Sequence, residues 1–368
     1  MTNLSASGRF ELLPAPPASD EVRGEKMQNP GFGRFFTDNM VVIPYREGEG
    51  WGLGSLRPYG PIPMDPAGSV LHYGQAIFEG LKAYRQPDGG TALFRPLANA
   101  HRFNASARRL AMPELPVELF MEAAELLVSN DRAWVPTAVG ESLYLRPFMI
   151  GTEAALGIKP SGEYLFILIT SPAGAYFPQG VKPVTVWISD EYVRAAPGGT
   201  GTAKCAGNYA GSLLAQQEAK GRGCDQVVWI DAVRRQIVEE MGGMNIAFIY
   251  EENGKTTLVT PALTGTLLPG ITRMSLLEVA KELGLGAEER TITIDDWETD
   301  LREGRMTEAF ACGTAAVITP IGTVKSSRGT WVVKDGQTGP VSAKLRETLL
   351  NIQHGLVPDT HGWLHRIR

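Results

Sequence analysis

Cysteine and histidine are scarce in this chain. Its 368 residues include three cysteines, Cys205, Cys224 and Cys312, and five histidines. An odd and widely spread set of cysteines argues against a disulfide framework or a zinc cluster and fits a reducing compartment. The histidines show no metal-like spacing, so no metal ligand is predicted.

Long apolar runs and blocks of one charge are also missing. No run approaches the roughly 20 residues needed to cross a bilayer. The N-terminus lacks the basic start and apolar stretch of a secretory signal. The net charge is −5 with both signs interspersed, so nucleic acid and anionic membranes are poor candidate partners. We therefore expect a cytoplasmic protein.

Two domains are expected, because a chain of 368 residues is too long for one ordinary core. Residues 1–30, rich in Pro, Ser and charge, predict a flexible lead-in. A smaller α/β domain is predicted at 31–172 and a larger one at 183–368, separated by a Pro/Gly-rich loop at 173–182. The predicted fold class is α+β, with mainly antiparallel sheets and flanking helices.

Apolar periodicity predicts the individual elements. The expected strands include FFTDNMVVIPY, SVLHYG, LKAYRQ, SLYLRPFMIG, EYLFILITSP, VTVWIS, QVVWID, QIVEE, NIAFIY and TLVTP, with QVVWID and QIVEE forming a hairpin. TALFRPLANAHRFNASARRLAM predicts a strand running into a helix whose apolar face carries Leu97, Phe103, Ala107 and Leu110. Further helices are expected in VELFMEAAELLVSND, YAGSLLAQQEAKG and RMSLLEVAKELG.

Lys204 lies among glycines and small residues in PGGTGTAKCAGNY, just before a helix expected to start near Tyr209. A nucleophilic lysine must be partly neutral, and a tight, desolvated pocket lowers the pKa of an ammonium group. Small neighbours would also let a flat cofactor come close. Taken alone, however, a lysine flanked by glycines is more often an ordinary loop residue. Its role therefore depends on the rest of the chain.

Glu240 ends the predicted strand QIVEE. A carboxylate directed at a pyridine nitrogen keeps that nitrogen protonated and the ring electron-withdrawing. The alternative is a glutamate on an edge strand in solvent. Since side chains alternate along a strand, only one of Glu239 and Glu240 can point at a site, and Glu239 is expected in solvent.

Two further segments could bind an anion. In LLPGITR, a Pro-Gly turn leads through Ile271 and Thr272 into a helix whose N-terminal N–H groups would suit a phosphate. An ordinary capped helix with Thr272 as its N-cap is the alternative. The turn Gly313-Thr314-Ala315 lies between two apolar, strand-like runs and can offer N–H groups and a hydroxyl.

The N-terminal half offers polar and aromatic candidates. Tyr73 and Phe78 are expected near a sheet edge, and Arg102 lies on a helix, where a surface arginine is the default. Tyr144 and Arg146 are two residues apart and so share one face of a strand. An inward arginine on an apolar strand needs a buried partner or an anionic ligand.

Many segments, in the same order along the chain, resemble the fold-type IV pyridoxal-phosphate enzymes. The closest resemblance is to the longer, eukaryote-like branch of the branched-chain amino acid aminotransferases, from about Phe32 to the C-terminus. The segments that carry it are FTDNM, HYGQAIFEGLKAYR, LFRPLANAHR, YLRPFMIGTE, GAYFPQG, AKCAGNY, EEMGGMN, LLPGITR and CGTAA.

The resemblance implies a two-domain architecture, the cofactor pyridoxal 5'-phosphate (PLP) and a role for each matching residue. Lys204 matches the catalytic Schiff-base lysine, Tyr209 the partner of the cofactor's phenolic oxygen, and Glu240 the partner of its pyridine nitrogen. The phosphate-binding positions are matched by Arg102, Ile271, Thr272, Gly313 and Thr314. The substrate pocket is matched by Phe32, Tyr73, Phe78, Tyr144, Arg146, Tyr176, Thr314 and Ala315, with Arg146 near the acidic side chain of the co-substrate.

The implied reaction is transamination of L-leucine, L-isoleucine and L-valine with 2-oxoglutarate, giving branched-chain 2-oxo acids and L-glutamate. The resemblance also implies a homodimer in which the segment around Ile158 reaches the partner chain. Alternatives are another fold-type IV activity, namely D-amino acid transamination or aminodeoxychorismate lysis, and a non-catalytic cofactor-binding protein.

Two features depart from the family pattern. Mammalian relatives carry a redox Cys-x-x-Cys after the Gly-Thr-Ala turn, whereas this chain has Ala316 and Thr319 there. Thiol regulation of that kind is therefore not expected. Ala247 stands where an aromatic residue is usual, and Phe248 follows one place later, so different packing behind Glu240 is expected.

Overall fold

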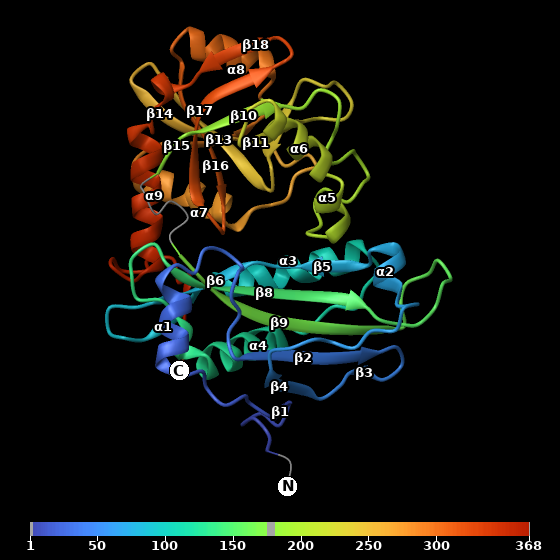
Figure 1. Ribbon diagram of the computed structural model, residues 1–368. Coiled ribbons are helices and arrows are strands. Elements are labelled where there is room, and N and C mark those ends of the chain that lie inside the picture. Colours follow the sequence, from blue (N-terminus) through green and yellow to red (C-terminus); the bar gives the residue numbers. More distant parts are fainter. Residues whose placement is uncertain (1–2, 175–180, 368) are drawn as a thin grey trace. The chain divides into compact units, whose positions relative to one another are not determined.

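The computed structural model describes residues 3–174 and 181–367, which form two compact units (Figure 1). The first unit contains residues 3–174, 203–206 and 352–367, and the second contains 181–202 and 207–351. Residues 175–180 of the expected interdomain loop lie outside the described residues. Unlike in the predicted division, two short segments from the C-terminal half belong to the first unit. One of them is the segment that carries Lys204.

A twisted sheet with the strand order β1-β4-β2-β9-β8-β6-β7-β19 forms the centre of the first unit. Its strands are β1 (Phe10–Leu12), β2 (Asn39–Arg46), β4 (Gly54–Pro58), β6 (Leu81–Arg85), β7 (Thr91–Phe94), β8 (Ser142–Gly151), β9 (Glu163–Ala173) and β19 (Leu364–Ile367), with β3 (Gly50–Trp51) on β2 and β5 (Ala76–Phe78) on β8. Its helices are α1 (Asp20–Gln28), α2 (Ser69–Tyr73), α3 (Pro96–Arg109), α4 (Val117–Asn130) and the 3-10 turn η1 (Arg132–Trp134).

Helices α3 and α4 pack against this sheet through aromatic side chains. The ring centroids of Phe103 on α3, Phe120 on α4 and Phe166 on β9 lie 5.6–6.0 Å apart, and all three residues are buried. Such large rings account for much of the apolar area that a core removes from water. This packing fixes α3 over the sheet, and α3 carries two residues that matter for the site below.

The N-terminal lead-in is partly built into the first unit. Phe10 on β1 is fully buried, and β1 pairs with β4 in parallel, with Phe10 opposite Gly54. A Cβ at Gly54 would lie 2.5 Å from the Phe10 ring, so only glycine fits beneath it. Helix α1, in contrast, buries none of its residues.

The second unit is built on a sheet with the strand order β12-β11-β10-β17-β16-β13-β14-β15. Its strands are β10 (Val184–Ile188), β11 (Gln226–Ile230), β12 (Val238–Met241), β13 (Met244–Glu252), β14 (Lys255–Pro261), β15 (Gly286–Arg290), β16 (Met306–Gly313) and β17 (Val317–Ser326), with β18 (Gly329–Val332) on β17. Its helices are α5 (Ala206–Ala210), α6 (Leu213–Gly221), α7 (Ile271–Glu282), α8 (Ile294–Arg302), η2 (Lys334–Gly336) and α9 (Pro340–Gln353). Most strand pairs in both sheets are antiparallel, which confirms the predicted α+β class.

Three sequence expectations were wrong in detail. The segment SVLHYG forms the single-turn helix α2, which ends at Gly74 in the left-handed conformation (φ 60°), and not a strand. The helix expected near Tyr209 is two helices, α5 and α6. Leu97 is 53% exposed, because six residues along a helix place it about 120° around the axis from the buried Phe103.

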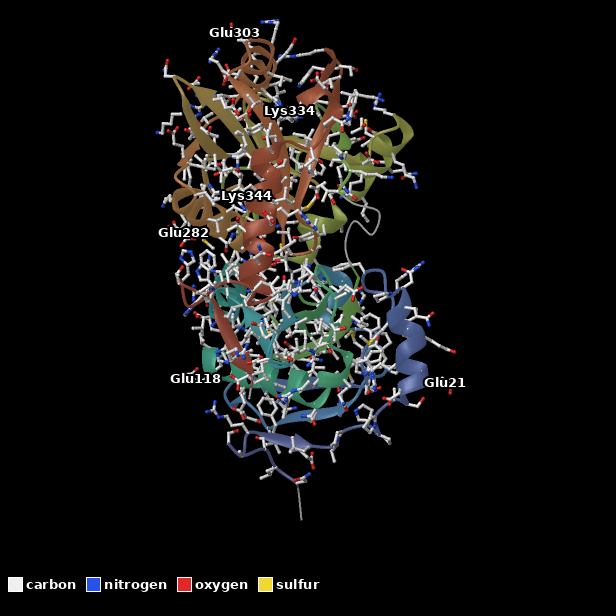
Figure 2. The ribbon with its side chains drawn as sticks, turned by 90° about the vertical axis from the view of Figure 1, so that its left-hand side faces the viewer. Glu21, Glu118, Glu282, Glu303, Lys334 and Lys344 are labelled. Atoms are coloured by element: carbon white, nitrogen blue, oxygen red, sulfur yellow. The ribbon has the colours of Figure 1, made fainter. Side chains whose placement is uncertain are left out.

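Acidic side chains lie in the first turns of several helices. Figure 2 labels Glu21 and Glu118, which lie in the first turns of α1 and α4, where a negative charge faces the positive end of the helix dipole. Lys344 on α9 pairs with Glu347 at 2.9 Å, one helical turn further on. Among the described residues, none of the helices combines the length and apolar character that crossing a membrane requires.

Candidate active site

The main chain around Lys204 is held within the first unit. Its backbone N–H donates to Ser106 Oγ at 2.9 Å, and its carbonyl accepts from the Phe78 N–H at 3.0 Å. Cys205 forms an isolated β-bridge with Ile77. The Lys204 Nζ atom lies 4.6 Å from the centroid of the Phe78 ring. The main chain at Lys204 is thus fixed by α3 and β5.

Arg146, Tyr144, Phe78 and Phe32 form one cluster in the first unit. Arg146 Nη2 donates to the Tyr144 hydroxyl at 3.0 Å, and its guanidinium carbon lies 4.9 Å from the Phe78 centroid. The rings of Phe32 and Tyr144 meet edge to face at 4.8 Å. The Arg146 Nε atom is buried without a hydrogen-bond partner. A buried donor of this kind is costly unless a ligand satisfies it, so this cluster suits an anionic group beside apolar walls.

Arg102 is buried, contrary to the default of a surface arginine. Its Nε and Nη2 atoms donate to the two carboxylate oxygens of Glu79 at 2.7 and 2.9 Å. The Arg102 side chain is 9% exposed and that of Glu79 is fully buried. The Glu79 backbone N–H also donates to Pro147 O at 2.7 Å. The structure thus gives Arg102 a carboxylate partner that the sequence analysis did not identify.

Two of the remaining candidates in the first unit lie on its surface. Tyr73, 42% exposed, donates its hydroxyl hydrogen to the Leu156 carbonyl. Ile158 is 89% exposed. Tyr176 lies outside the described residues.

In the second unit, Glu240 is buried and contacts three other segments of the chain. Arg194 Nε lies 2.7 Å from Glu240 Oε2, while Oε1 accepts from the Leu268 N–H at 2.8 Å and from Asn245 Nδ2 at 3.4 Å. Glu240 is 2% exposed. A charged guanidinium and a backbone donor both favour the ionised carboxylate. Glu240 is therefore not a glutamate in solvent.

The expectation for Glu239 was wrong. It is 4% exposed, because every residue of β12 is buried and neither face of this strand meets solvent. Its Oε1 accepts a hydrogen bond from the Thr266 hydroxyl, and its Oε2 is buried without a partner. Burial, reinforced by the charge of Asp231, raises the pKa of Glu239, although Thr266 and Arg194 act in the opposite direction.

The N-terminus of α7 is suited to an anion. Gly270 is its N-cap and provides no side-chain cap, whereas Thr272 lies inside the helix and is not the N-cap. The first N–H groups of a helix have no intrahelical acceptor, so those of Ile271 and Thr272 are available to a ligand. A Cβ at Gly270 would lie 1.8 Å from Asn245 Oδ1, which makes glycine obligatory there.

Tyr209 and the Gly-Thr-Ala turn complete the candidates in the second unit. Tyr209 lies on α5, and a Cβ at Gly243 would lie 3.4 Å from its Cε1 atom. Thr314 and Ala315 form the half-buried turn between β16 and β17, as the sequence predicted. The turn ends at Val317 with φ at 64°, a strained value for a β-branched residue. Its backbone is therefore held in an unusual conformation next to the predicted anion-binding groups.

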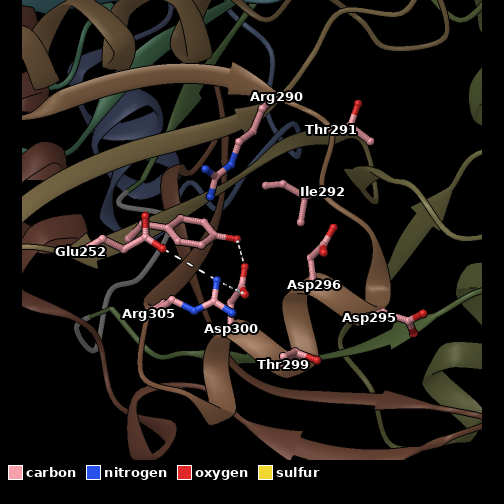
Figure 3. Close-up of a pocket in the computed structure, with 10 residues that line it drawn as sticks. Glu252, Arg290, Thr291, Ile292, Asp295, Asp296, Thr299, Asp300 and Arg305 are labelled. Carbon is pink, nitrogen blue, oxygen red and sulfur yellow. Dashed lines mark hydrogen bonds and ion pairs between the residues drawn. The ribbon is translucent and has the colours of Figure 1, made fainter.

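A separate hollow of about 420 Å³ also lies in the second unit (Figure 3). Several of its polar side chains contact one another: the Tyr250 hydroxyl donates to Asp300 at 2.9 Å, Asp300 lies 2.7 Å from Arg305, and the Arg290 guanidinium lies 4.2 Å from the Tyr250 centroid. Asp295 pairs with Arg328, and Asp296 caps α8 through Thr293. The hollow contains none of the predicted site residues.

Comparison with known proteins decides the family. The model of the amino-transferase class IV family matches residues 76–324. This chain belongs to the class IV aminotransferases. It is 58% identical over 360 residues to a probable branched-chain-amino-acid aminotransferase of Streptomyces coelicolor, covering 97% of this chain and 98% of that protein. It is also 58% identical over 352 residues to a branched-chain-amino-acid aminotransferase of Mycolicibacterium smegmatis, with 95% and 96% covered.

The fold agrees with solved structures of the same family. The branched-chain aminotransferase of the thermophilic archaeon Thermoproteus uzoniensis, solved with norvaline, superposes with a TM-score of 0.73 at 26% identity, over 90% of this chain and 100% of that one. The predicted family resemblance is therefore confirmed. As a class IV aminotransferase, this chain is an enzyme.

Arg194 and Glu79, the partners of Glu240 and Arg102, were not among the residues predicted from the sequence. Arg194 stands in YVRAAPGG, ten residues before Lys204, and Glu79 directly follows Phe78. A charged residue next to an apolar, Gly-rich run is a weak signal by itself. Only the folded chain shows which carboxylate meets which guanidinium.

Proposed function

We propose that this aminotransferase is a PLP-dependent branched-chain amino acid aminotransferase. It transfers the amino group of L-leucine, L-isoleucine or L-valine to 2-oxoglutarate, yielding a branched-chain 2-oxo acid and L-glutamate. The observation that carries this proposal is the 58% identity, over nearly the whole of both chains, to relatives of that name. The buried Arg194–Glu240 pair supports it, because a stable carboxylate is what a protonated pyridine nitrogen requires.

The residues present fit PLP. The N-terminus of α7, which has no side-chain cap, would offer the N–H groups of Ile271 and Thr272 to the phosphate. Gly313, Thr314 and Arg102 are the further phosphate-binding residues of the proposal. Tyr209 would donate to the phenolic oxygen, and Glu240 would hold the pyridine nitrogen protonated.

Lys204 is the proposed catalytic residue. Its amine would hold PLP through the aldehyde carbon of the cofactor. Once the substrate amine has displaced it, the Lys204 amine would act first as the base for the proton on the substrate Cα and then as the acid that returns this proton. When bound, PLP supplies the electron sink for the electron pair left at Cα. The hydrogen bonds of the Lys204 main chain to Ser106 and Phe78 fix the backbone from which this amine extends.

The substrate side chain is proposed to contact the aromatic cluster of the first unit. Phe32, Phe78 and the ring of Tyr144 offer apolar contacts to a branched side chain. Arg146, with its buried and unpartnered Nε, would bind the side-chain carboxylate of 2-oxoglutarate and glutamate. Tyr73, Tyr176, Thr314 and Ala315 are the other proposed substrate residues, with the Thr314-Ala315 turn receiving the α-carboxylate.

A homodimer is part of the proposal. Exposed apolar side chains gather around α2 and the segment after β8, including Leu71, Leu156 and Ile158 at 59%, 64% and 89% exposure. The bridge between Gly68 and Ala154 ties the two segments together. Exposed apolar side chains on neighbouring segments are typical of a protein interface, and Ile158 would reach the partner subunit. We also propose a cytoplasmic location, in keeping with three free cysteines.

A panel of amino donors tests the activity. Purified protein loaded with PLP is mixed with L-leucine, L-isoleucine, L-valine or D-alanine, and the visible absorption of the cofactor is followed. The proposal expects rapid loss of the visible band with the three branched L-amino acids and no comparable change with D-alanine. A response to D-alanine alone would point to D-amino acid transamination, and no response to any amino acid would support a non-catalytic protein.

A further inference from the structure

Arg194 occupies a central position in the buried part of the second unit. Its side chain is 6% exposed. Besides the ion pair with Glu240, Nη1 donates to the Thr266 carbonyl at 2.8 Å and to the Gly201 carbonyl at 3.3 Å, and Nη2 also donates to Gly201 at 3.3 Å. One guanidinium thus joins β12, the loop that precedes Lys204 and the loop that precedes α7.

The two loops meet closely at this point. A Cβ at Gly201 would lie 2.1 Å from the Thr266 carbonyl oxygen, so any side chain there would push the loops apart. Both carbonyls, of Gly201 and Thr266, accept from the same guanidinium. The planar arginine fork suits this double task, because its donors have a fixed geometry that a lysine ammonium lacks.

The adjacent glutamates compete for one positive charge. Glu239 and Glu240 are both buried, yet the guanidinium forms its ion pair with Glu240, at 2.7 Å. Glu239 is bound by the neutral hydroxyl of Thr266 and keeps one oxygen without a partner. Two adjacent buried carboxylates sharing one guanidinium are unfavourable, so one of them is expected to be protonated. The raised pKa of Glu239 agrees with this assignment.

We infer that Arg194 is a positioning residue of the proposed transaminase site: it makes Glu240, and not Glu239, the ionised carboxylate, and it fixes the loops before Lys204 and α7 around it. This inference rests on the proposed function. Arg194 acts through Glu240, and its loss would deprive the buried Glu240 of its guanidinium. That carboxylate would then take up a proton and no longer hold a pyridine nitrogen protonated.

The test compares four variants of the PLP-loaded enzyme: Arg194→Met, Arg194→Lys, Glu240→Gln and Glu239→Gln. Three quantities are measured, namely the turnover number with L-leucine, the dissociation constant of PLP, and the pH midpoint of the cofactor's visible absorption. Arg194→Met and Glu240→Gln should each lower turnover about 100-fold or more and shift the pH midpoint in the same direction. Arg194→Lys should have a turnover number and a pH midpoint between those of the parent and those of Arg194→Met. Glu239→Gln should stay within about two-fold of the parent turnover, because the amide oxygen can still accept the hydrogen bond from the Thr266 hydroxyl and Arg194 stays paired with Glu240.

The double variant Arg194→Met/Glu240→Gln separates positioning from a merely structural role. If Arg194 acts through Glu240, the double variant should be within about two-fold of Glu240→Gln alone. Arg305→Met is the control, since it removes an arginine paired at 2.7 Å with Asp300 outside the proposed site. It should leave the pH midpoint unchanged.

Three results would overturn the inference. They are an unchanged pH midpoint in Arg194→Met, a further loss of ten-fold or more in the double variant, and a Glu239→Gln variant that behaves like Glu240→Gln. The pH titration needs bound PLP but no turnover. A parent protein inactive with every amino acid would therefore refute the proposed function, while the titration would still decide the inference about Arg194.

Discussion

The guanidinium of Arg102 and the carboxylate of Glu79 form a two-point ion pair, at 2.7 and 2.9 Å, in the interior of the first unit. This pair links α3 to the residue that directly follows β5, and those two elements also hold the main chain of Lys204. Arg102 therefore has a structural partner in addition to the phosphate-binding role proposed for it.

Removing Glu79 should be strongly destabilising. Glu79→Ala leaves a buried guanidinium without its carboxylate, which typically costs about 3–5 kcal/mol in free energy of unfolding. Glu163→Ala is a matched control, because the pair of Glu163 with Arg46 is 46% and 61% exposed and should contribute at most about 1 kcal/mol. Urea unfolding of both variants measures the difference. Equal losses would show that the Arg102–Glu79 pair is no stronger than a surface pair.

A carboxylate cap in the loop between β11 and β12 predicts a pH dependence of stability. Asp231 Oδ2 accepts from the N–H groups of Val233 and Arg234, and Oδ1 accepts from those of Gln236 and Ile237, at 2.6–3.1 Å. Burial raises the pKa of Asp231, but these four bonds outweigh it and the net pKa is lowered. The folded state therefore binds fewer protons here than the unfolded state.

It follows that Asp231 contributes stability above its unfolded pKa of about 4, and that this contribution is lost as the pH falls through the lower, folded value. Asp231→Asn should lower the free energy of unfolding by about 1–3 kcal/mol at pH 7, and the difference from the parent should shrink below about pH 4. Asp190→Asn, at an exposed position, is the control. A difference that persists at low pH would contradict the assignment to the carboxylate.

Thiol chemistry is expected to be slow in the native enzyme. Cys205, Cys224 and Cys312 are 4%, 5% and 1% exposed. Burial raises the pKa of Cys312 to about 12, which leaves almost no thiolate at pH 8. A disulfide reagent at pH 8 should react with three thiols after unfolding and only slowly before it. Fast modification of one native thiol with loss of turnover would contradict this expectation.

Substitution of Arg146 should affect the two half-reactions unequally. Arg146→Met removes the proposed carboxylate ligand but keeps apolar bulk, so the half-reaction with L-leucine should change less than about three-fold. The KM for 2-oxoglutarate should rise about ten-fold or more, as expected for loss of a charge-assisted bond. Arg146→Lys should restore part of the lost affinity for 2-oxoglutarate. Single-turnover measurements of each half-reaction distinguish these effects, and equal losses in both halves would assign Arg146 a general structural role.

Local sequence patterns predicted much of the fold because they depend on neighbours in the chain. The hairpin from β11 to β12, the helix after LFRP and the turn at Thr314 were all predicted from periodicity and from Gly or Pro positions. The segment SVLHYG failed, since five residues between two glycines are too few to show a helical period.

Pairing between residues far apart in the chain limited how much of the site could be predicted from the sequence. The sequence singled out Glu240 and Arg102, but not Arg194 and Glu79, because those pairs are 46 and 23 residues apart in the chain. Glu239 was misplaced for a related reason. Alternation along a strand separates two faces, but it does not show that both faces are covered.

The central claim is that the amine of Lys204 carries out transamination of branched-chain amino acids, and one measurement tests it most directly. Parent protein and Lys204→Ala, both loaded with PLP, are mixed with L-leucine and 2-oxoglutarate, and L-glutamate is quantified. The parent should form glutamate, and the variant should form none above background while still binding PLP through the groups around Glu240 and α7. Turnover of Lys204→Ala close to that of the parent would contradict the account.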